Sequence, residues 1–423
     1  MRKISILFKT GFFHIFGSSV INKIISFLSS IILVHILTKS EYGVFTYAWN
    51  IYSLILLLNG FGIESAILQL CSEQSGNKSY EHKICNYGTR FGIKFNILLA
   101  ILTIVVAAFF PLKLPGSDKI LYLLSLLPMS QLLLGIILNI LRSQKRNQDY
   151  AKLSTINTIL ILIGSTFGAV WLREKGMALG YYVAYTVSFL IGRLYMKVEL
   201  LHQKENMINT KEKKTILSIA FISMCNNGLS QLLYLLDIFI LGIVDPQETV
   251  LASYKVSTMI PTALTFIPLS LITYLYPYFA QHNKDGEWCL KKYKQVVMGL
   301  GMINLLIATF LLLFSPYIIL IFFGKEYLDA VTIFRILAIN YFFSGTFRVL
   351  SGNLLVTQRK LKFNLIIATI SGLINIIADF LFIQWWGAIG AAYANTLVVI
   401  ISGTVSTIYL IYTFKHLKTT NEN

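Results

Sequence analysis

The sequence is poor in charge. Only 13% of its 423 residues are Asp, Glu, Lys or Arg, whereas 56% are hydrophobic and the mean hydropathy is +0.68. In soluble globular proteins about a quarter of the residues are charged. This composition excludes an ordinary soluble domain, and apolar runs of about 20 residues, long enough to cross a bilayer as a helix, recur along the chain. We therefore expect an all-α polytopic membrane protein.

Cysteine is also scarce, and no phosphate-binding loop pattern occurs. Cys71, Cys85 and Cys289 fall in connections expected to be cytoplasmic, and Cys225 falls inside an apolar run, so we expect no disulfide. The spacing of Cys71, His82 and Cys85 matches no zinc pattern. The sequence thus predicts no bound metal, no cofactor, no catalytic residues and no ATP hydrolysis within the chain.

The apolar runs predict twelve transmembrane helices, six on each side of a polar linker. The predicted spans are 11–37, 43–70, 87–110, 119–141, 151–172, 177–198, 214–243, 250–279, 293–323, 328–356, 361–385 and 387–414. The first run follows Arg2, Lys3 and Lys9 without a cleavage site, so we interpret it as a retained first span.

The loop charges predict the orientation. Most of the 36 lysines and arginines lie at the N-terminus, the C-terminus and every second connection. The opposite ends carry seven: Lys39, Lys113, Lys119, Arg173, Lys175, Lys255 and Lys325. Because basic residues near span ends are held on the cytoplasmic side, both termini should be cytoplasmic. The net charge of +17 then comes from the basic cytoplasmic side, which sets the topology and contacts anionic lipid head groups. No nucleic-acid partner is expected.

The two halves of the chain resemble each other. The segments 143–146 (Ser-Gln-Lys-Arg) and 357–360 (Thr-Gln-Arg-Lys) match at an offset of 214, and Ala178-Leu179-Gly180 matches Ala388-Ile389-Gly390. Six spans is an even number, so two such copies point the same way and are related by an axis along the membrane normal. We predict two parallel six-helix lobes, 1–201 and 214–423, joined by a cytoplasmic linker at 202–213.

The charges inside the spans are the candidates for function, because a charge at the centre of a span costs about 2.5 to 3.5 kcal/mol and faces a cavity or a partner. Lys23 lies near the middle of the first span, too deep for its side chain to reach water at either end. Asn22 lies beside it, and Asn226 and Asn227 lie at a similar depth of the seventh span. We interpret these four residues, with Arg348 of the tenth span, as candidate substrate-binding groups; for Arg348, snorkelling to the cytoplasmic surface is a nearly equal alternative.

Four further charges are candidates for ion coupling or gating: Glu64, Asp237, Arg335 and Asp379. Glu64 could hold a proton or a cation, or be an ordinary interfacial carboxylate. Arg335 and Asp379 could instead form a structural ion pair with each other or with Asp237. Arg193 lies near a cytoplasmic end, where snorkelling accounts for it.

Several short motifs, in collinear order over the chain, carry a family resemblance. They are Leu37-Thr38-Lys39-Ser40-Glu41-Tyr42-Gly43, Asn59-Gly60-Phe61-Gly62, Asp237, Tyr254-Lys255-Val256, Tyr276-Pro277, Phe323-Gly324-Lys325-Glu326-Tyr327, Ile336-Leu337-Ala338 and the segment 386–392 (Trp-Gly-Ala-Ile-Gly-Ala-Ala). The chain resembles the polysaccharide-exporter flippases, the O-antigen and capsule repeat-unit transporters of the multidrug/oligosaccharidyl-lipid/polysaccharide exporter superfamily. Lipid II flippases of that superfamily have two further C-terminal helices, which this sequence lacks.

The resemblance implies two six-helix lobes in a V around a central cavity. It also implies movement of an undecaprenyl-pyrophosphate-linked oligosaccharide from the cytoplasmic to the periplasmic leaflet of the bacterial inner membrane. Alternating access would be driven by a gradient of H+ or Na+. The further partners that the resemblance implies are membrane lipids and, in some systems, a polysaccharide polymerase and a chain-length regulator. Two alternatives remain: a multidrug or organic-cation antiporter of the same fold, and a non-transporting membrane protein of glycan assembly.

Overall fold

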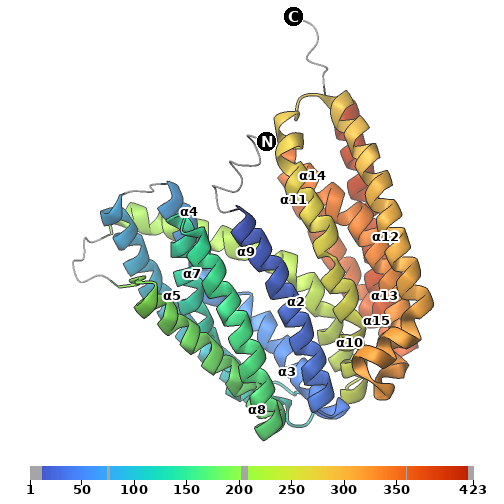
Figure 1. The fold of residues 1–423 in the computed structure, drawn as a ribbon, viewed down its shortest axis with the longest axis horizontal. Helices are drawn as coiled ribbons and strands as arrows, with labels where there is room; N and C mark the ends of the chain where they lie inside the picture. Colours follow the sequence, from blue (N-terminus) through green and yellow to red (C-terminus); the bar gives the residue numbers. More distant parts are fainter. Residues whose placement is uncertain (1–11, 74–76, 202–207, 359, 418–423) are drawn as a thin grey trace, which may run out of the picture. The chain divides into compact units, whose positions relative to one another are not determined.

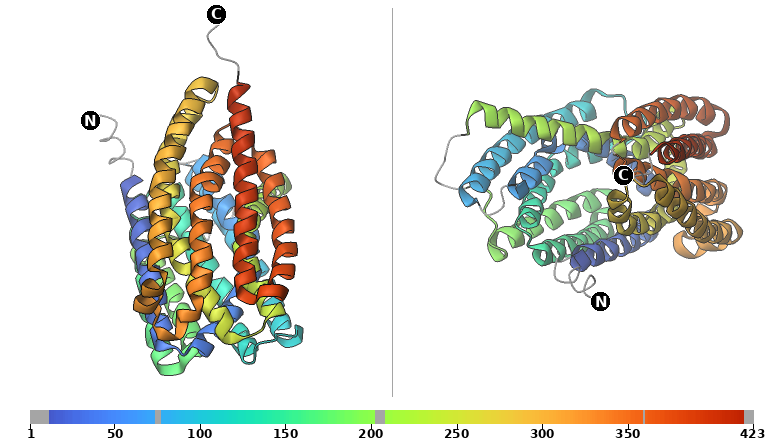
Figure 2. Two further views of the ribbon diagram at one scale, coloured as in Figure 1. Left: turned by 90° about the vertical axis from the view of Figure 1, so that its right-hand side faces the viewer. Right: turned by 90° about the horizontal axis from the view of Figure 1, so that it is seen from above.

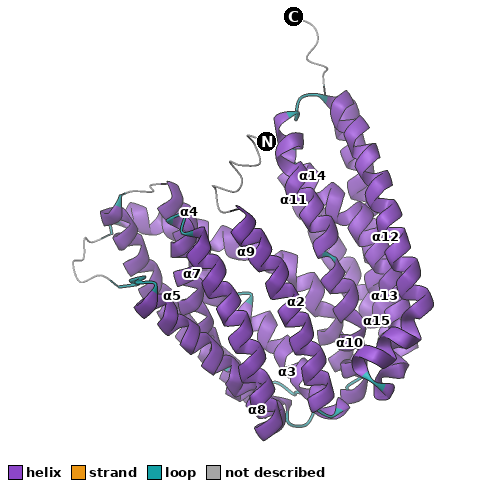
Figure 3. Ribbon diagram, viewed as in Figure 1, coloured by secondary structure: helices purple, strands orange, loops and turns teal. Residues whose placement is uncertain are grey.

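The computed structural model describes residues 12–73, 77–201, 208–358 and 360–417. Throughout this part of the chain the regular secondary structure is helical (Figure 3). The chain divides into two compact units, unit 1 (Met1–Leu232) and unit 2 (Leu233–Asn423), which are blue to green and yellow to red in Figure 1. The predicted lobe boundary at 202–213 stays a prediction; residues 202–207 lie outside the described chain, and α9 begins at Thr210.

The described part of unit 1 is built from seven helices, two short helical turns and the first part of α9. They are α2 (Phe12–Ile36), α3 (Lys39–Leu56), η1 (Asn59–Gly62), α4 (Ile63–Glu73), α5 (Lys78–Phe109), α6 (Ser117–Leu124), α7 (Leu127–Ser143), α8 (Asn147–Leu190), η2 (Ile191–Tyr195) and α9 (Thr210–Val244). α2 packs along α8, α3 packs on α6 and α8, and α4 packs on α5 and α7. A buried apolar core that includes Ile63, Ile67, Leu132 and Ile136 joins α4 to α7.

Unit 2 consists of the end of α9 and the helices that follow it. They are α10 (Glu248–Leu264), α11 (Phe266–Gln281), α12 (Gly286–Phe323), η3 (Lys325–Ala330), α13 (Val331–Phe343), η4 (Ser344–Arg348), α14 (Val349–Thr357) and α15 (Leu361–Lys415). α13 packs on α12 and on α15, and the three run side by side, orange to red, in the left view of Figure 2. A second core, around Phe279, Tyr293, Leu354 and Phe414, joins α11, α12, α14 and α15.

The described helices fit a membrane. Eight are long and apolar enough to cross a bilayer by length and composition, or nine if the bent pair α6 and α7 is one span. Long apolar side chains stand exposed on α5 and α12, among them Leu98, Leu306, Leu313 and Ile321. Such surfaces suit lipid rather than water. The protein is therefore a multi-pass membrane protein, and the exact count of twelve spans stays a prediction.

Two of the long helices fold back on themselves. In α8 the backbone leaves the helical region at Leu172 and Arg173, and Gly164 and Gly168 then lie against Gly180 and Gly176. In α15 it leaves the helical region at Gly387, and Gly390 lies against Phe382. Both reversals fall where the sequence predicts a junction between spans. Their dihedral angles agree closely (φ 54°, ψ −138° at Arg173; φ 55°, ψ −137° at Gly387), and their positions differ by 214 residues, the offset between the segments 143–146 and 357–360.

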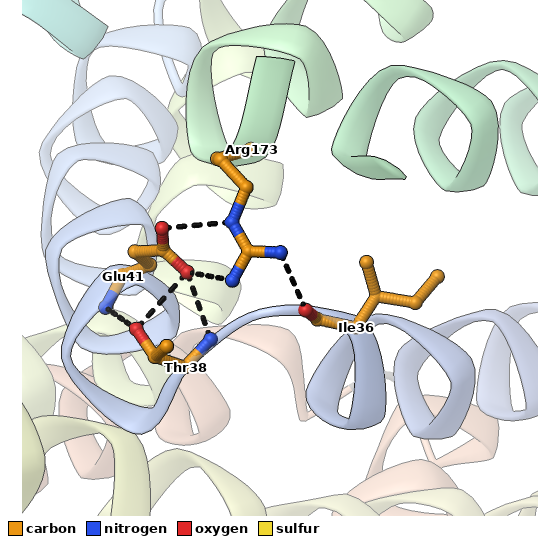
Figure 4. Close-up of polar contacts among 4 residues, drawn as sticks. All are labelled: Ile36, Thr38, Glu41 and Arg173. Carbon is orange, nitrogen blue, oxygen red and sulfur yellow. Dashed lines mark hydrogen bonds and ion pairs between the residues drawn. The ribbon is translucent and has the colours of Figure 1, made fainter. Parts of the chain in front are cut away.

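Arg173 joins the reversal of α8 to the connection between α2 and α3 (Figure 4). Its guanidinium donates from Nε and Nη2 to the two carboxylate oxygens of Glu41 at 2.9 and 2.6 Å, and from Nη1 to the carbonyl of Ile36 at 3.0 Å. Glu41 also completes a capping box with Thr38 at the start of α3. Arg173 has a positive φ, which is strained for a residue other than glycine. The hydrogen bonds of its guanidinium stabilise the reversal in spite of this strain.

Several predicted spans are interrupted. The range 43–70 breaks at η1, the range 119–141 bends by 40° between α6 and α7, and the range 250–279 breaks between Leu264 and Phe266. The range 328–356 contains the π-helical turn η4. Hydropathy identifies the length of an apolar run but not the point at which its backbone departs from the helix.

Candidate functional site

Two carboxylates meet inside unit 2. Asp237 lies near the end of α9 with 3% of its surface exposed, and Asp379 lies in the first half of α15 with none exposed. Their side chains are in contact. Buried acids of the same sign need compensation, because each charge has been taken out of water and repels the other.

Asp237 is held by three donors. Tyr254 Oη of α10 donates to its Oδ2 at 2.7 Å, and Asn395 Nδ2 donates to the same oxygen. Asn375 Nδ2 donates to its Oδ1 at 3.4 Å. The spacing of Asn375 and Asp379 on α15 puts them on one helix face, and the reversal at Gly387 returns Asn395 alongside them. Donors from α10 and from both limbs of the folded-back α15 therefore converge on Asp237.

Asp379 has no such donors. Both of its carboxylate oxygens, and Oδ1 of Asn375, are buried without a hydrogen-bond donor among the described residues. A charged Asp237 cannot supply one, because an ionised carboxylate only accepts. These three oxygen atoms are of the carboxylate and amide types that a hard cation prefers as ligands. A proton shared by the two acids would compensate part of the same charge.

No larger acidic or histidine-rich cluster competes with this site. Within the described chain, no group of three or more His, Cys, Asp or Glu side chains is placed to hold a metal ion. The donor types at Asp237 and Asp379 are carboxylate and amide oxygens, which suit a hard cation rather than zinc.

Lys23 lies on α2 with an exposed side chain, and no ion pair or hydrogen bond ties it to another residue of the described chain. Its neighbour Asn22 is half-buried and donates to Ser154 Oγ of α8 at 2.9 Å. The sequence grouped the two, but Asn22 helps pack α2 on α8. Asn226 and Asn227 lie on α9, and their side chains fall outside the described part of the structure.

Arg348 ends the π-helical turn η4 and is half-buried. Arg335 is exposed on α13, and its Nε donates to Ser315 Oγ of α12 at 2.7 Å. Among the described interactions it pairs with neither acid of unit 2, so the structure brings Asp237 and Asp379 together and leaves Arg335 apart.

Glu64 lies in unit 1, directly after the break in the second predicted span. It is in the first turn of α4, and its Oε1 accepts a long bond of 3.3 Å from Asn59 Nδ2 of η1. Its carboxylate rests on Gly135 of α7, where a Cβ atom would overlap it.

Four residues of unit 2 were not among the predicted site residues, although Tyr254 and Lys255 belong to a motif of the family resemblance. Tyr254, Asn375 and Asn395 complete the surroundings of the two acids, and Lys255 is a half-buried lysine within α10. The spacing of Asn375 and Asp379 by one helical turn was a readable signal. The contribution of Asn395 depends on the reversal at Gly387, which composition alone does not reveal.

The chain is similar to known transporters. A model of the family described as "polysaccharide biosynthesis protein" matches residues 8–283. No curated protein sequence matches the chain. Among solved structures, an inward-facing multidrug-resistance MATE family transporter of the MOP superfamily is 13% identical with a TM-score of 0.77, over 95% of this chain and 96% of that one.

Two other solved structures extend the likeness. The lipid II flippase MurJ, in an inward-closed conformation, is 19% identical with a TM-score of 0.70, over 95% of this chain and 87% of that one. A MOP superfamily transporter from Pyrococcus furiosus, described by the reversed polarity of its binding pocket, is 13% identical with a TM-score of 0.66, over 98% and 96%. At these identities the likeness concerns the fold. Because the family model covers well over half of the sequence, the chain belongs to the polysaccharide biosynthesis protein family, and it has the fold of the MOP superfamily transporters.

Proposed function

We propose that the protein is a flippase that moves an oligosaccharide linked to a lipid diphosphate, undecaprenyl pyrophosphate in a bacterium, across the membrane in exchange for a coupling cation. The observation that carries the coupling is the buried pair Asp237 and Asp379 with its donor-free oxygens. The family supports a glycan as cargo. No covalent step is needed, because the cargo changes leaflet without changing its bonds.

The proposal includes twelve spans in two parallel six-helix repeats. The folding back of α8 and of α15 supports it, because each of these elements then supplies two crossings. The basic residues at the termini and alternate connections support cytoplasmic termini in the inner membrane.

Lys23 is the proposed counter-charge for the diphosphate. A diphosphate cannot enter hydrocarbon bare, and an exposed lysine with no ion pair to the described residues lowers the cost of moving it. Arg348 and the amides of Asn226 and Asn227 are proposed to assist, whereas Asn22 positions the helix that carries Lys23. Arg335 is proposed to take part in gating, and the support for this role is that its charged side chain is exposed.

The coupling cation, Na+ or H+, is proposed to bind between Asp379, Asp237 and Asn375 Oδ1, with Asn395 and Tyr254 orienting Asp237. A bound cation neutralises charge that is otherwise uncompensated, so it changes which packing of α9, α10 and α15 is favoured. The ion gradient then drives the cycle through that difference.

The experiment replaces Lys23 by Ala in cells whose surface polysaccharide depends on this gene. Surface polysaccharide should be lost at normal membrane abundance of the variant, and Lys23→Arg should keep most of it because the charge remains. Lys94→Ala, which removes an exposed lysine of α5, is the matched control. Unchanged polysaccharide in Lys23→Ala would reject the assignment.

A second candidate is a multidrug antiporter, favoured by the likeness to MATE transporters. It predicts that deletion increases sensitivity to cationic drugs while surface polysaccharide stays normal. A non-transporting role in glycan assembly, beside a polymerase or chain-length regulator, predicts polysaccharide loss that does not depend on the acids of unit 2.

A further inference from the structure

The second predicted span of unit 1 is broken in its middle by three consecutive left-handed residues. Gly60 (φ 53°), Phe61 (φ 56°) and Gly62 (φ 76°) separate α3 from α4. The positive φ of Phe61 is unfavourable, and the packing of its ring against Phe91, Phe95 and Phe221 offsets that cost. The break divides the span between two sets of neighbours, since α3 packs on α6 and α8 and α4 packs on α5 and α7.

A buried amide fills the gap that the break leaves. Asn96 of α5 is 1% exposed; its Oδ1 accepts from the Gly60 N–H at 2.8 Å. Its Nδ2 donates to the Pro128 carbonyl at 2.8 Å and to Asn59 Oδ1 at 2.7 Å. The break is therefore a built part of unit 1, held from α5 and α7.

Glu64 is the titratable group at this break, and nothing described compensates its charge fully. Its carboxylate accepts only the long bond from Asn59 and is seated against α7 in the space that Gly135 leaves free. The other titratable group facing it is a tyrosine, Tyr185 of α8. That hydroxyl accepts from Gln131 Nε2 at 3.1 Å, and Gln131 Oε1 in turn accepts from Tyr52 at 2.7 Å. No basic side chain of the described chain forms an ion pair with Glu64.

We propose that Glu64 binds and releases a proton, and that its charge state sets the break at 59–62. When charged, Glu64 favours the break, because the break exposes free N–H groups at the start of α4 and brings the Asn59 amide to the carboxylate. When neutral, it loses both gains, and the span relaxes toward a continuous helix. The site thus adds a proton-dependent bend in unit 1 to the proposed transport cycle, but its test needs no transport.

Hydrogen exchange followed by mass spectrometry reads the break directly in purified protein. In alkaline buffer, where the carboxylate of the unmodified chain is charged, the peptide spanning 57–64 should exchange about twofold to fivefold more slowly in Glu64→Gln than in the unmodified chain, the range that a charge at a helix N-terminus is worth. Glu73→Gln is the matched control, because it makes the same change on α4 away from the break, where Glu73 accepts from Gln69. Equal exchange in Glu64→Gln and the unmodified protein would overturn the proposal.

Infrared difference spectra between acidic and alkaline buffer provide the second measurement. A carboxylic-acid carbonyl band should disappear in Glu64→Gln and remain in the double variant Asp237→Asn/Asp379→Asn. A band that survives Glu64→Gln unchanged would show that Glu64 does not titrate and would overturn the proposal. If Glu64→Gln does not fold, Glu64→Asp replaces it as a variant that retains an acid. The unmodified protein is then tested by itself: after correction for intrinsic exchange rates, its peptide 57–64 must exchange more slowly in acidic than in alkaline buffer. Loss of polysaccharide export in Lys23→Ala bears on the transport function alone, so the two hypotheses fail separately.

Discussion

Unit 1 and unit 2 both bury acids within their helices but surround them differently. Glu64 of unit 1 stands at a helix break with one long hydrogen bond and no second acid among its described contacts. Asp237 of unit 2 receives three donors and touches Asp379, whose own oxygens have none. A single weakly compensated acid suits a proton, whereas two acids with spare oxygens suit a larger cation. Under the two proposals above, the units therefore bind different ions, a proton at Glu64 and a larger cation at Asp237 and Asp379.

The largest expected effect comes from emptying the proposed cation site of unit 2. With Na+ at 100 times its dissociation constant, binding should stabilise the unmodified protein by about 2.7 kcal/mol, and Asp379→Asn should lose that gain. The measurement is the thermal unfolding midpoint in detergent at equal ionic strength of NaCl and choline chloride. Glu287→Gln, which removes an exposed acid of α12, should behave like the unmodified protein. Sodium stabilisation that persists in Asp379→Asn would place the cation elsewhere.

A smaller effect is expected from overfilling the seat of Glu64. In Gly135→Ala the new methyl group would overlap the carboxylate, and overpacking of this kind costs about 1–3 kcal/mol. Gly299→Ala is the control, because nothing lies within 4 Å of the Cβ position there. Denaturant unfolding should separate the two, and the sodium response of Gly135→Ala should stay normal. A lost sodium response would mean that the two acid sites are not independent.

Removing one donor from Asp237 should cost less again. Asn395→Ala leaves a buried charge with one fewer partner, so stability without sodium should fall by about 1–2 kcal/mol, and added sodium should restore part of the loss. Asn364→Ala offers a matched control, since it removes an amide of α15 that donates to a neutral carbonyl, Gly352. Equal losses in both variants, insensitive to sodium, would argue against a cation at this site.

Sequence patterns predicted the helical class and the positions of the two reversals, because apolar runs and the breaks between them can be recognised from neighbouring residues alone. The break at 59–62 was not predicted, although Asn59, Gly60 and Gly62 carry the turn chemistry, because an apolar run this long favours an uninterrupted helix. The candidates Asp237 and Asp379 came from the cost of charge inside a span. Their contact depends on tertiary packing that no local pattern encodes. The same holds for the hydrogen bond from Asn395 to Asp237, which lie 158 residues apart.

The two helix reversals should show the smallest effect, and they extend the comparison from acids to backbone. Gly387 takes a positive φ without strain, whereas Arg173 takes it at a cost of about 1–3 kcal/mol and forms the ion pair with Glu41 in return. Arg173→Gly removes strain and ion pair together, so its unfolding midpoint should change little. Glu41→Gln removes the ion pair, keeps the capping box and leaves the strain, so it should lower the midpoint more. The reverse order would mean that the strain at Arg173 is small compared with the hydrogen bond to Ile36 that Arg173→Gly also loses. In that case the arginine of unit 1 would stabilise the reversal more than the glycine that takes its place in unit 2.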